Sequence, residues 1–330
     1  MKYLSRIGLG IFFGIILGCA HPTVGRNPTT EPSGSADIAP PAVVLGPSFA
    51  EGLKYYRDGD VARAQITLEN SVFLSTEKVA DRSLQLLHYL YLITGQYDEA
   101  FKVGTELLSS LPYSPHAYEA VGVAQLWSGQ TRLALSSLMR AREFEGHSPR
   151  TQFYIALAHE RLKHTLDMKK AISRAVTQYE QILRANAKDF SANYELANLL
   201  LFFRQDIDRV PLLLSNARAA VDSLSDSDTG VGKQWYTQYY LALSDGILAY
   251  QKKDPERALS ILRGVLPYVR PYAKADLAEL YFYIGNCLDS LGQKPQAAQF
   301  LQRSASLDPH GAYQSRLEAQ VRALSSVKSR

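Results

Sequence analysis

From Phe49 onward, hydrophobic residues recur along the chain with the 3.6-residue period of an α-helix. Turn residues interrupt this pattern about every 15–20 residues. No segment shows the alternation of β-branched and polar residues that marks a strand. The pattern therefore predicts an all-α fold built from short helices joined by turns.

A repeated spacing of small residues predicts that these helices are paired. Gly59, Gly95 and Gly129 stand 36 and 34 residues apart, each between two amphipathic segments. The arrangement returns around Gly292, and Lys253 replaces the turn glycine once. Helices packed about 8–10 Å apart need small side chains where they cross, and the turn needs a residue that tolerates positive φ. The small residues are Gly52, Gly122, Gly246 and Gly285 seven positions before the turn, with His88 as the exception, and Ala64, Ala100, Ala134, Ala258 and Ala297 five positions after it.

This pattern resembles the tetratricopeptide repeat (TPR) family, in which helical hairpins of about 34 residues stack into a superhelix. Pro112 and Pro309 stand where that family often ends its second helix. The resemblance implies that residues 48–330 form a TPR-type α-solenoid of about seven hairpins, with a C-terminal capping helix at 312–327. We expect the hairpins near residues 48–76, 81–112, 116–147, 150–186, 190–224, 234–268 and 275–307.

Two hairpins depart from the regular length. Extra residues at His164–Lys170 and at Asp206–Pro211 are expected to lengthen the turns of the fourth and fifth hairpins. After the fifth hairpin, Ser225–Lys233 is expected to form a polar loop.

The N-terminus has the order of a secretory signal. Lys2 and Arg6 precede an uncharged apolar run, which is too short to cross a bilayer as a helix of about 20 residues. The run ends in Ile-Leu-Gly before Cys19, which resembles the lipobox of bacterial lipoproteins. That resemblance implies cleavage of residues 1–18 and acylation of Cys19. An ordinary cleaved signal and an uncleaved anchor remain as alternatives.

The segment that follows is predicted to be a flexible tether. Residues 20–47 contain six prolines, no aromatic residue and few charges, so they cannot bury enough apolar surface to fold. Their 28 residues span at most roughly 90–100 Å. Ala20, rather than aspartate, follows Cys19, which favours the outer membrane over retention at the inner one.

Composition narrows the range of functions. The formal charge of +4 falls to +2 when Lys2 and Arg6 leave with the signal, and no segment carries a long run of one sign. Nucleic-acid binding needs clustered cations, so we exclude it. Cys287 lies in an apolar helical stretch and is expected to be a buried structural thiol.

No motif predicts catalysis, a metal or a cofactor. His159 and His164 stand five residues apart, which is about 140° around a helix, whereas a zinc-protease motif places two histidines four apart. The sequence around Gly230–Lys233 lacks the first glycine and the final serine or threonine of a phosphate-binding loop. No Gly-x-Ser-x-Gly segment occurs. We therefore expect a protein that is not an enzyme.

The TPR resemblance implies that the first helix of each hairpin faces a concave groove. Aromatic side chains among polar ones are typical of peptide-recognition surfaces, although aromatics at helical spacing are also typical of a core. The lysine–asparagine pair that grips a C-terminal carboxylate in some TPR proteins is not supported, because Tyr194 precedes Asn198 by one turn. The predicted groove residues are Tyr56, Tyr89, Trp127, Tyr194, Asn198, Phe202, Tyr250, Phe282 and Asn286, with Arg57, Ile93 and Glu119 beside them.

These features together predict a membrane-anchored scaffold of the bacterial envelope. Its partners would be other envelope proteins or their peptides, in a pilus secretin, outer-membrane assembly or peptidoglycan machinery. The alternative is a lipoprotein that captures a small ligand such as a peptide or glycan. The sequence predicts neither the identity of the partner nor the oligomeric state.

Overall fold

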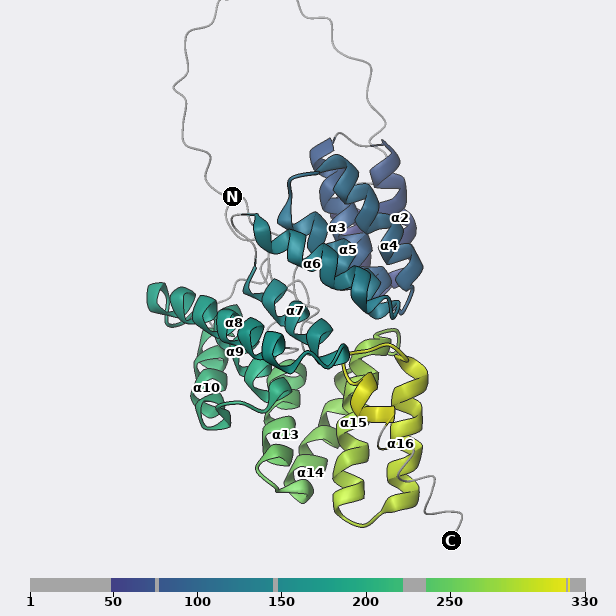
Figure 1. Cartoon of the computed structure of the whole chain (residues 1–330). Helices are drawn as coiled ribbons and strands as arrows, with labels where there is room; N and C mark the ends of the chain where they lie inside the picture. The colour runs from purple at the N-terminus through teal and green to yellow at the C-terminus, as the bar shows by residue number, and fades with distance from the viewer. Residues whose placement is uncertain (1–48, 75–76, 145–147, 222–235, 319, 321–330) are drawn as a thin grey trace, which may run out of the picture.

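The structure, a computed structural model, describes residues 49–74, 77–144, 148–221, 236–318 and 320, and these residues form helices and turns without a strand (Figure 1). The helices pair into seven hairpins, which confirms the predicted all-α solenoid. The pairs are α1 (Phe49–Arg57) with α2 (Val61–Leu74), α3 (Glu77–Ile93) with α4 (Tyr97–Ser110), α5 (Pro115–Trp127) with α6 (Thr131–Glu143), α7 (Pro149–Arg161) with α8 (Thr165–Ala185), α9 (Phe190–Phe203) with α10 (Val210–Val221), α13 (Ala242–Gln251) with α14 (Pro255–Val265), and α15 (Lys274–Ser290) with α16 (Lys294–Leu307).

Three short helices complete the described chain: η1 (Ile207–Arg209), the π-helical turn η2 (Tyr236–Leu241) and η3 (Leu266–Tyr268). None of the helices in the described ranges combines the length and hydropathy that crossing a bilayer requires. The proposed signal (1–18), the lipidated Cys19 with its tether (19–47) and the polar loop Ser225–Lys233 lie outside the described residues.

Small residues lie at the helix crossings, as the spacing predicted. A Cβ added at Gly52 would lie 2.6 Å from the side chain of Leu68 on the paired helix. His88, the exception, is buried and donates from Nε2 to the carbonyl oxygen of Ala120 in the next hairpin, at 2.9 Å. Burial lowers the pKa of His88 to about 4, so its imidazole is neutral at physiological pH. The same arrangement recurs in three other hairpins, where an added Cβ would lie 2.7 Å from the leucine side chain. The pairs are Gly122 with Leu138, Gly246 with Leu262 and Gly285 with Leu301.

The turns within the hairpins contain a residue in the left-handed region. Four of these residues are glycines, and Lys253 takes the same conformation with φ of 62°, as its position in the repeat predicted. Two further turns contain Lys163 and Arg204, with φ of 61° and 53°. The glycines are Gly59, Gly95, Gly129 and Gly292.

The two irregular hairpins accommodate their extra residues differently. In the fifth, η1 lengthens the turn between α9 and α10, as expected. In the fourth, the expectation of a longer turn is wrong, because α7 ends at Arg161 and the 21-residue α8 begins at Thr165. The extra residues extend α8 instead. His159 and His164 therefore lie on opposite sides of a tight turn and not on one helix.

The stack of hairpins curves until its last hairpin meets its second. Helix α15 packs on α3, and in Figure 1 the α15–α16 hairpin lies directly below the block formed by α1–α6. Arg270, just before α15, donates from Nη1 to the carbonyl oxygen of Tyr56 at 3.0 Å. Of the expected capping helix, residues 314–318 are helical, and residues 321–327 lie outside the described part of the chain. The superhelix therefore closes on itself.

Candidate functional site

The nine predicted groove residues lie on the first helices of their hairpins, but most are buried. Eight of them expose at most 7% of their surface. Tyr250 is the exception and is half-buried. A buried side chain can contact a partner only after the group that covers it has moved. Contact with a partner therefore stays a prediction for the eight buried residues, which are Tyr56, Tyr89, Trp127, Tyr194, Asn198, Phe202, Phe282 and Asn286.

Other parts of the chain already use several of these side chains. The hydroxyl groups of Tyr56 and Tyr89 lie 3.0 Å apart and share a hydrogen bond. The hydroxyl of Ser244 donates to Oδ1 of Asn198 at 2.8 Å, and Asn198 donates from Nδ2 to the carbonyl oxygen of Tyr194. Both ends of the Asn198 amide are therefore satisfied within the fold.

The chain's own C-terminal segment, Asp308–Leu317, fills the concave side. The ring of Tyr313 stacks on Phe282 with ring centroids 4.5 Å apart, and lies 5.2 Å from the ring of Phe202. The Tyr313 hydroxyl donates to Oε1 of the buried Glu279 at 2.9 Å. Burial raises the pKa of Glu279 well above its ordinary value. The groove predicted for a partner thus holds an intramolecular occupant.

Arg161 anchors this C-terminal segment to the turns of earlier hairpins. Its Nη2 donates to the carbonyl oxygens of His310 and Gly311 at 2.6 and 2.7 Å, and its Nη1 donates to that of Leu126. The Tyr97 hydroxyl donates to Asp308 Oδ1 at 2.7 Å. Burial lowers the pKa of Arg161 to about 10 and raises that of Asp308. The contacts with Asp308, His310 and Gly311 join positions more than 140 residues apart in the sequence.

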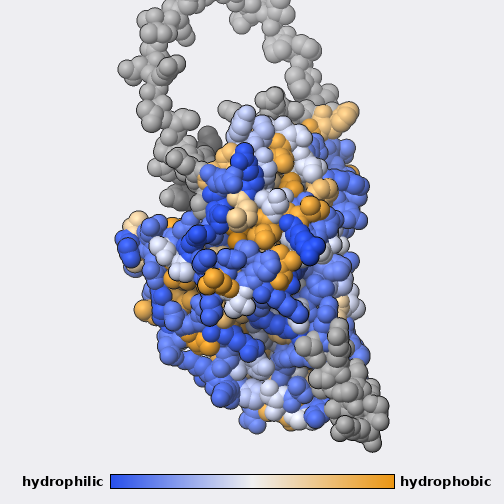
Figure 2. Space-filling model, viewed as in Figure 1, coloured by the Kyte–Doolittle hydropathy of each residue, from blue (hydrophilic) through white to orange (hydrophobic). Residues whose placement is uncertain are grey.

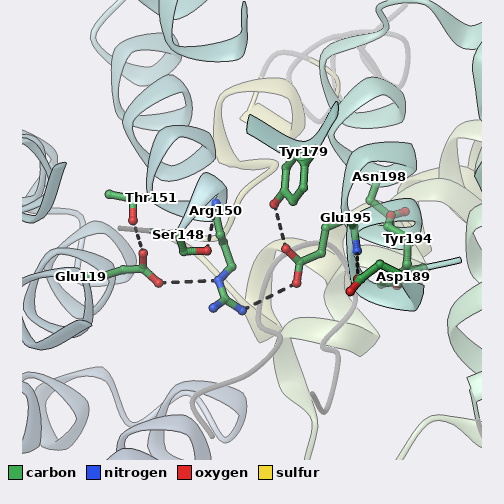
Figure 3. A network of polar contacts seen from close by, with 10 residues as sticks. Glu119, Ser148, Arg150, Thr151, Tyr179, Asp189, Tyr194, Glu195 and Asn198 are labelled. Atoms are coloured by element: carbon green, nitrogen blue, oxygen red, sulfur yellow. Dashed lines mark hydrogen bonds and ion pairs between the residues drawn. The ribbon is translucent and has the colours of Figure 1, made fainter. Parts of the chain in front are cut away.

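A buried ionic network crosses the first helices of the third, fourth and fifth hairpins (Figure 3). Arg150 lies 3.6 Å from a carboxylate oxygen of Glu119 and 3.9 Å from one of Glu195. Thr151 donates to Glu119, and Tyr179 donates to Glu195 at 2.8 Å. Burial disfavours the charge of Arg150, but the carboxylates of Glu195 and Glu119 raise its pKa above the ordinary value. Each buried charge has a partner, so the network fixes the hairpins relative to one another.

The accessible part of the predicted groove surrounds Tyr250. A cavity of about 360 Å³ opens where the turns of the fifth and sixth hairpins meet the end of α15. Arg204 and Lys253 are exposed there, and neither forms an ion pair with another described residue. The cavity is lined by Arg204, Ile207, Tyr250, Gln251, Lys253, Pro255 and Ser290, which we call the Tyr250 pocket.

The face of the molecule that Figure 2 shows is mainly hydrophilic, with several groups of hydrophobic side chains among the hydrophilic ones. Phe73 and Tyr113 are the most exposed large hydrophobic residues among those described, at 90% and 81%. Scattered residues of this kind are normal on a soluble domain.

Sequence reasoning missed the arginines that organise the concave side. Arg161 and Arg150 look like ordinary helix-surface residues, and their partners are distant along the chain. Arg204 was also missed, but a signal was present: a residue other than glycine stands where the repeat turns. Lys253 also stands at a turn position in place of glycine, but the sequence alone does not indicate that it lines a pocket together with Arg204.

Comparisons with known proteins place the chain among distant helical-repeat structures only. No family model and no curated protein matches it. It is similar to a tetratricopeptide repeat protein from Parabacteroides merdae, with 16% identity over 84% of this chain and 96% of that one and a TM-score of 0.46. It is also similar to Cut9-Hcn1 of the APC/C, with 14% identity over 83% of this chain and 48% of that one, and a TM-score of 0.48. A thermophilic TPR protein from Thermus thermophilus shows 15% identity over 64% of this chain and 98% of that one, with a TM-score of 0.41.

These likenesses are too distant to carry an argument about function. The class of the protein rests instead on its own hairpins, with their small residues at the crossings and left-handed turns. The chain is an all-α solenoid of helical hairpins, with its own C-terminal segment packed on the concave side.

Proposed function

We propose that this chain is a non-catalytic, lipid-anchored scaffold that binds another envelope protein through the Tyr250 pocket. The observation that carries the proposal is the pocket itself: of the nine predicted groove residues, Tyr250 alone is open to solvent, and it borders a 360 Å³ cavity. The stacked hairpins around it supply a rigid frame.

The chemistry of the pocket suits a carboxylate next to an apolar group. Arg204 and Lys253 supply two positive charges, while Ile207 and Pro255 supply apolar walls and Tyr250 an aromatic one. A hydrogen bond to a charged group contributes about 1.5–3 kcal/mol, and a partly buried aromatic adds contact area at low entropic cost. A partner's acidic side chain or C-terminal carboxylate therefore fits the pocket.

Photo-crosslinking tests this interaction. A photoreactive phenylalanine derivative in place of Tyr250 should capture one or a few envelope proteins in intact membranes. The same derivative at Tyr113, which is 81% exposed at the joint of the second and third hairpins, is the matched control. Capture from position 113 alone, or from neither position, would contradict docking at the pocket.

Anchoring rests on Cys19 and the tether. Two acyl chains already hold a protein firmly on a membrane, so a triacylated cysteine is effectively permanent. We expect Cys19→Ala to leave the chain unprocessed or free in the periplasm, and the wild type to fractionate with the outer membrane in a sucrose gradient. Normal processing and membrane attachment of the variant would rule out the lipobox.

The volume of the Tyr250 pocket also favours a second candidate function, the capture of a small ligand. Small-molecule sites commonly measure about 300–1,000 Å³, and this cavity lies within that range. A small-ligand function predicts that position 250 captures no protein. It also predicts that an anionic peptide or glycan raises the melting temperature of the wild type but not that of an Arg204→Gly variant.

A further inference from the structure

Three potential metal ligands meet at the turn between α7 and α8. His159 lies in the last turn of α7, His164 directly precedes α8, and Asp167 lies in the first turn of α8. One ligand atom from each residue, an imidazole nitrogen or a carboxylate oxygen, lies within 4.8 Å of the others. Nothing in the proposed scaffold function uses these side chains.

The expectation that these histidines point apart was wrong because it assumed one continuous helix. Lys163 adopts the left-handed conformation, with φ of 61°, and its amide donates to the carbonyl oxygen of Glu160. The chain therefore reverses between the two histidines. Their Nδ1 atoms lie 3.4 Å apart instead of on different faces of a helix.

The nitrogen–nitrogen distance matches tetrahedral coordination. Zinc binds imidazole nitrogen at about 2.0–2.1 Å, and two ligands of a tetrahedron at that radius lie about 3.3–3.4 Å apart. The observed separation is 3.4 Å. The Asp167 side chain is 53% exposed and can approach an ion by changing rotamer, without movement of the backbone.

The surroundings keep the ligands available. His159 is partly buried, whereas His164 and Asp167 are exposed, so an ion can reach all three side chains from solvent. The Nζ atom of Lys170 lies 3.5 Å from Asp167 Oδ1 and competes for this carboxylate. That pair is exposed, so the competition is weak.

We propose that His159, His164 and Asp167 bind one divalent first-row transition-metal ion, with zinc as the best match to the geometry. Imidazole and carboxylate together suit such ions, whereas magnesium and calcium prefer oxygen ligands alone. Three protein ligands leave one tetrahedral position open for water or for a side chain of a partner. An ion here would also tie α7 to α8 and stabilise the fourth hairpin.

Calorimetric titration of the full chain, purified without a histidine tag, tests the site. Zn²⁺ should bind saturably at one ion per chain, Mg²⁺ should not bind, and Zn²⁺ should raise the melting temperature. The double variant His159→Ala/His164→Ala should lose this binding, and Asp167→Asn should weaken it by at least about tenfold. Lys170→Ala, which frees Asp167, should tighten it.

The matched control is His116→Ala, which changes a half-buried histidine in another hairpin and should bind like the wild type. Absence of saturable binding to the wild type would overturn the proposal. So would unchanged binding by the double variant, which would place the ion elsewhere on the chain. None of these outcomes depends on the Tyr250 pocket, so the two proposals can fail separately.

Discussion

The turns of hairpins one, two, three and seven differ from those of hairpins four, five and six. The first group turns at glycine, whereas the second turns at Lys163, Arg204 and Lys253. All seven residues have positive φ, between 53° and 85°. Each turn therefore contains a residue in the left-handed region, although the turn at Arg204 is longer and includes η1.

This difference separates turns that have the residue best suited to folding from turns that carry a side chain which folding does not require. A side chain at left-handed φ costs roughly 1–2 kcal/mol, which glycine avoids. Strain of this kind concentrates at functional sites. Lys163 lies between His159 and His164, while Arg204 and Lys253 line the Tyr250 pocket. Both proposed sites thus lie at the turns that lack glycine.

The same contrast appears in side chains at equal positions of the repeat. Tyr56 stands three residues before Gly59, and Tyr250 stands three residues before Lys253. Tyr56 is 2% exposed and hydrogen-bonded to Tyr89, whereas Tyr250 is half-buried beside a cavity. At this position of the repeat, the glycine-turn hairpin buries its tyrosine in the core, whereas the hairpin that turns at Lys253 leaves its tyrosine accessible.

The largest effect is expected for Trp127, in a glycine-turn hairpin. Its side chain is 1% exposed, so Trp127→Ala should lower the free energy of unfolding by about 3–5 kcal/mol. The matched variant Tyr250→Ala should cost clearly less, because that side chain is only partly buried. Urea unfolding of both variants measures the difference. Equal losses would show that the Tyr250 pocket is as much a part of the core as Trp127.

The second prediction moves a lysine into a glycine turn. A Cβ at Gly129 would lie 3.2 Å from the His310 ring of the C-terminal segment, whereas one at Gly292 meets nothing within 4 Å. Gly129→Lys should therefore cost about 2–3 kcal/mol, and Gly292→Lys only about 1 kcal/mol, the backbone cost. Thermal unfolding gives both values. If the Gly292 variant were as unstable as the Gly129 variant, the contact with the His310 ring would not explain the loss of stability at Gly129.

The third prediction concerns Glu279, which holds Tyr313 of the C-terminal segment. Burial raises its pKa in the folded state, so its contribution to stability is greatest below its ordinary pKa and is lost as pH rises through the raised value. Glu279→Gln should therefore be more stable than the wild type at pH 8, by roughly 1 kcal/mol. This difference should shrink toward pH 5. A pH-independent difference would indicate that the carboxylate stays ionised throughout.

Local periodicity explains why the hairpins were predictable. The positions of Gly129 and Ala134 follow from the crossing of two helices that are adjacent in sequence, and the same physics put Lys253 in a left-handed turn. The closure of the superhelix was not predictable, because Tyr97 and Asp308 are 211 residues apart. No local pattern indicates that they meet.

The site residues show where spacing arguments fail. Trp127 and Phe202 have the spacing of groove residues, but sequence alone does not reveal that Tyr313 and its neighbours cover them. His159 and His164 were separated by an argument that required a continuous helix. The rotation of about 100° per residue in a helix does not apply across a helix end. Because the turn at Lys163 lies between the two histidines, their side chains meet instead of pointing apart.

The central claim is that the charged turns serve binding and not folding, and one double variant tests it directly. Arg204→Gly/Lys253→Gly removes both cations and gives these turns the residue found in the glycine turns. The melting temperature should stay unchanged or rise, because the left-handed strain is relieved. Photo-crosslinking from position 250 should fall at least about tenfold, as expected when two charge-assisted contacts are lost. Lys252→Ala, an exposed neighbour outside the pocket, should leave both measurements unchanged. A double variant that melts lower, or that still crosslinks like the wild type, would contradict the account.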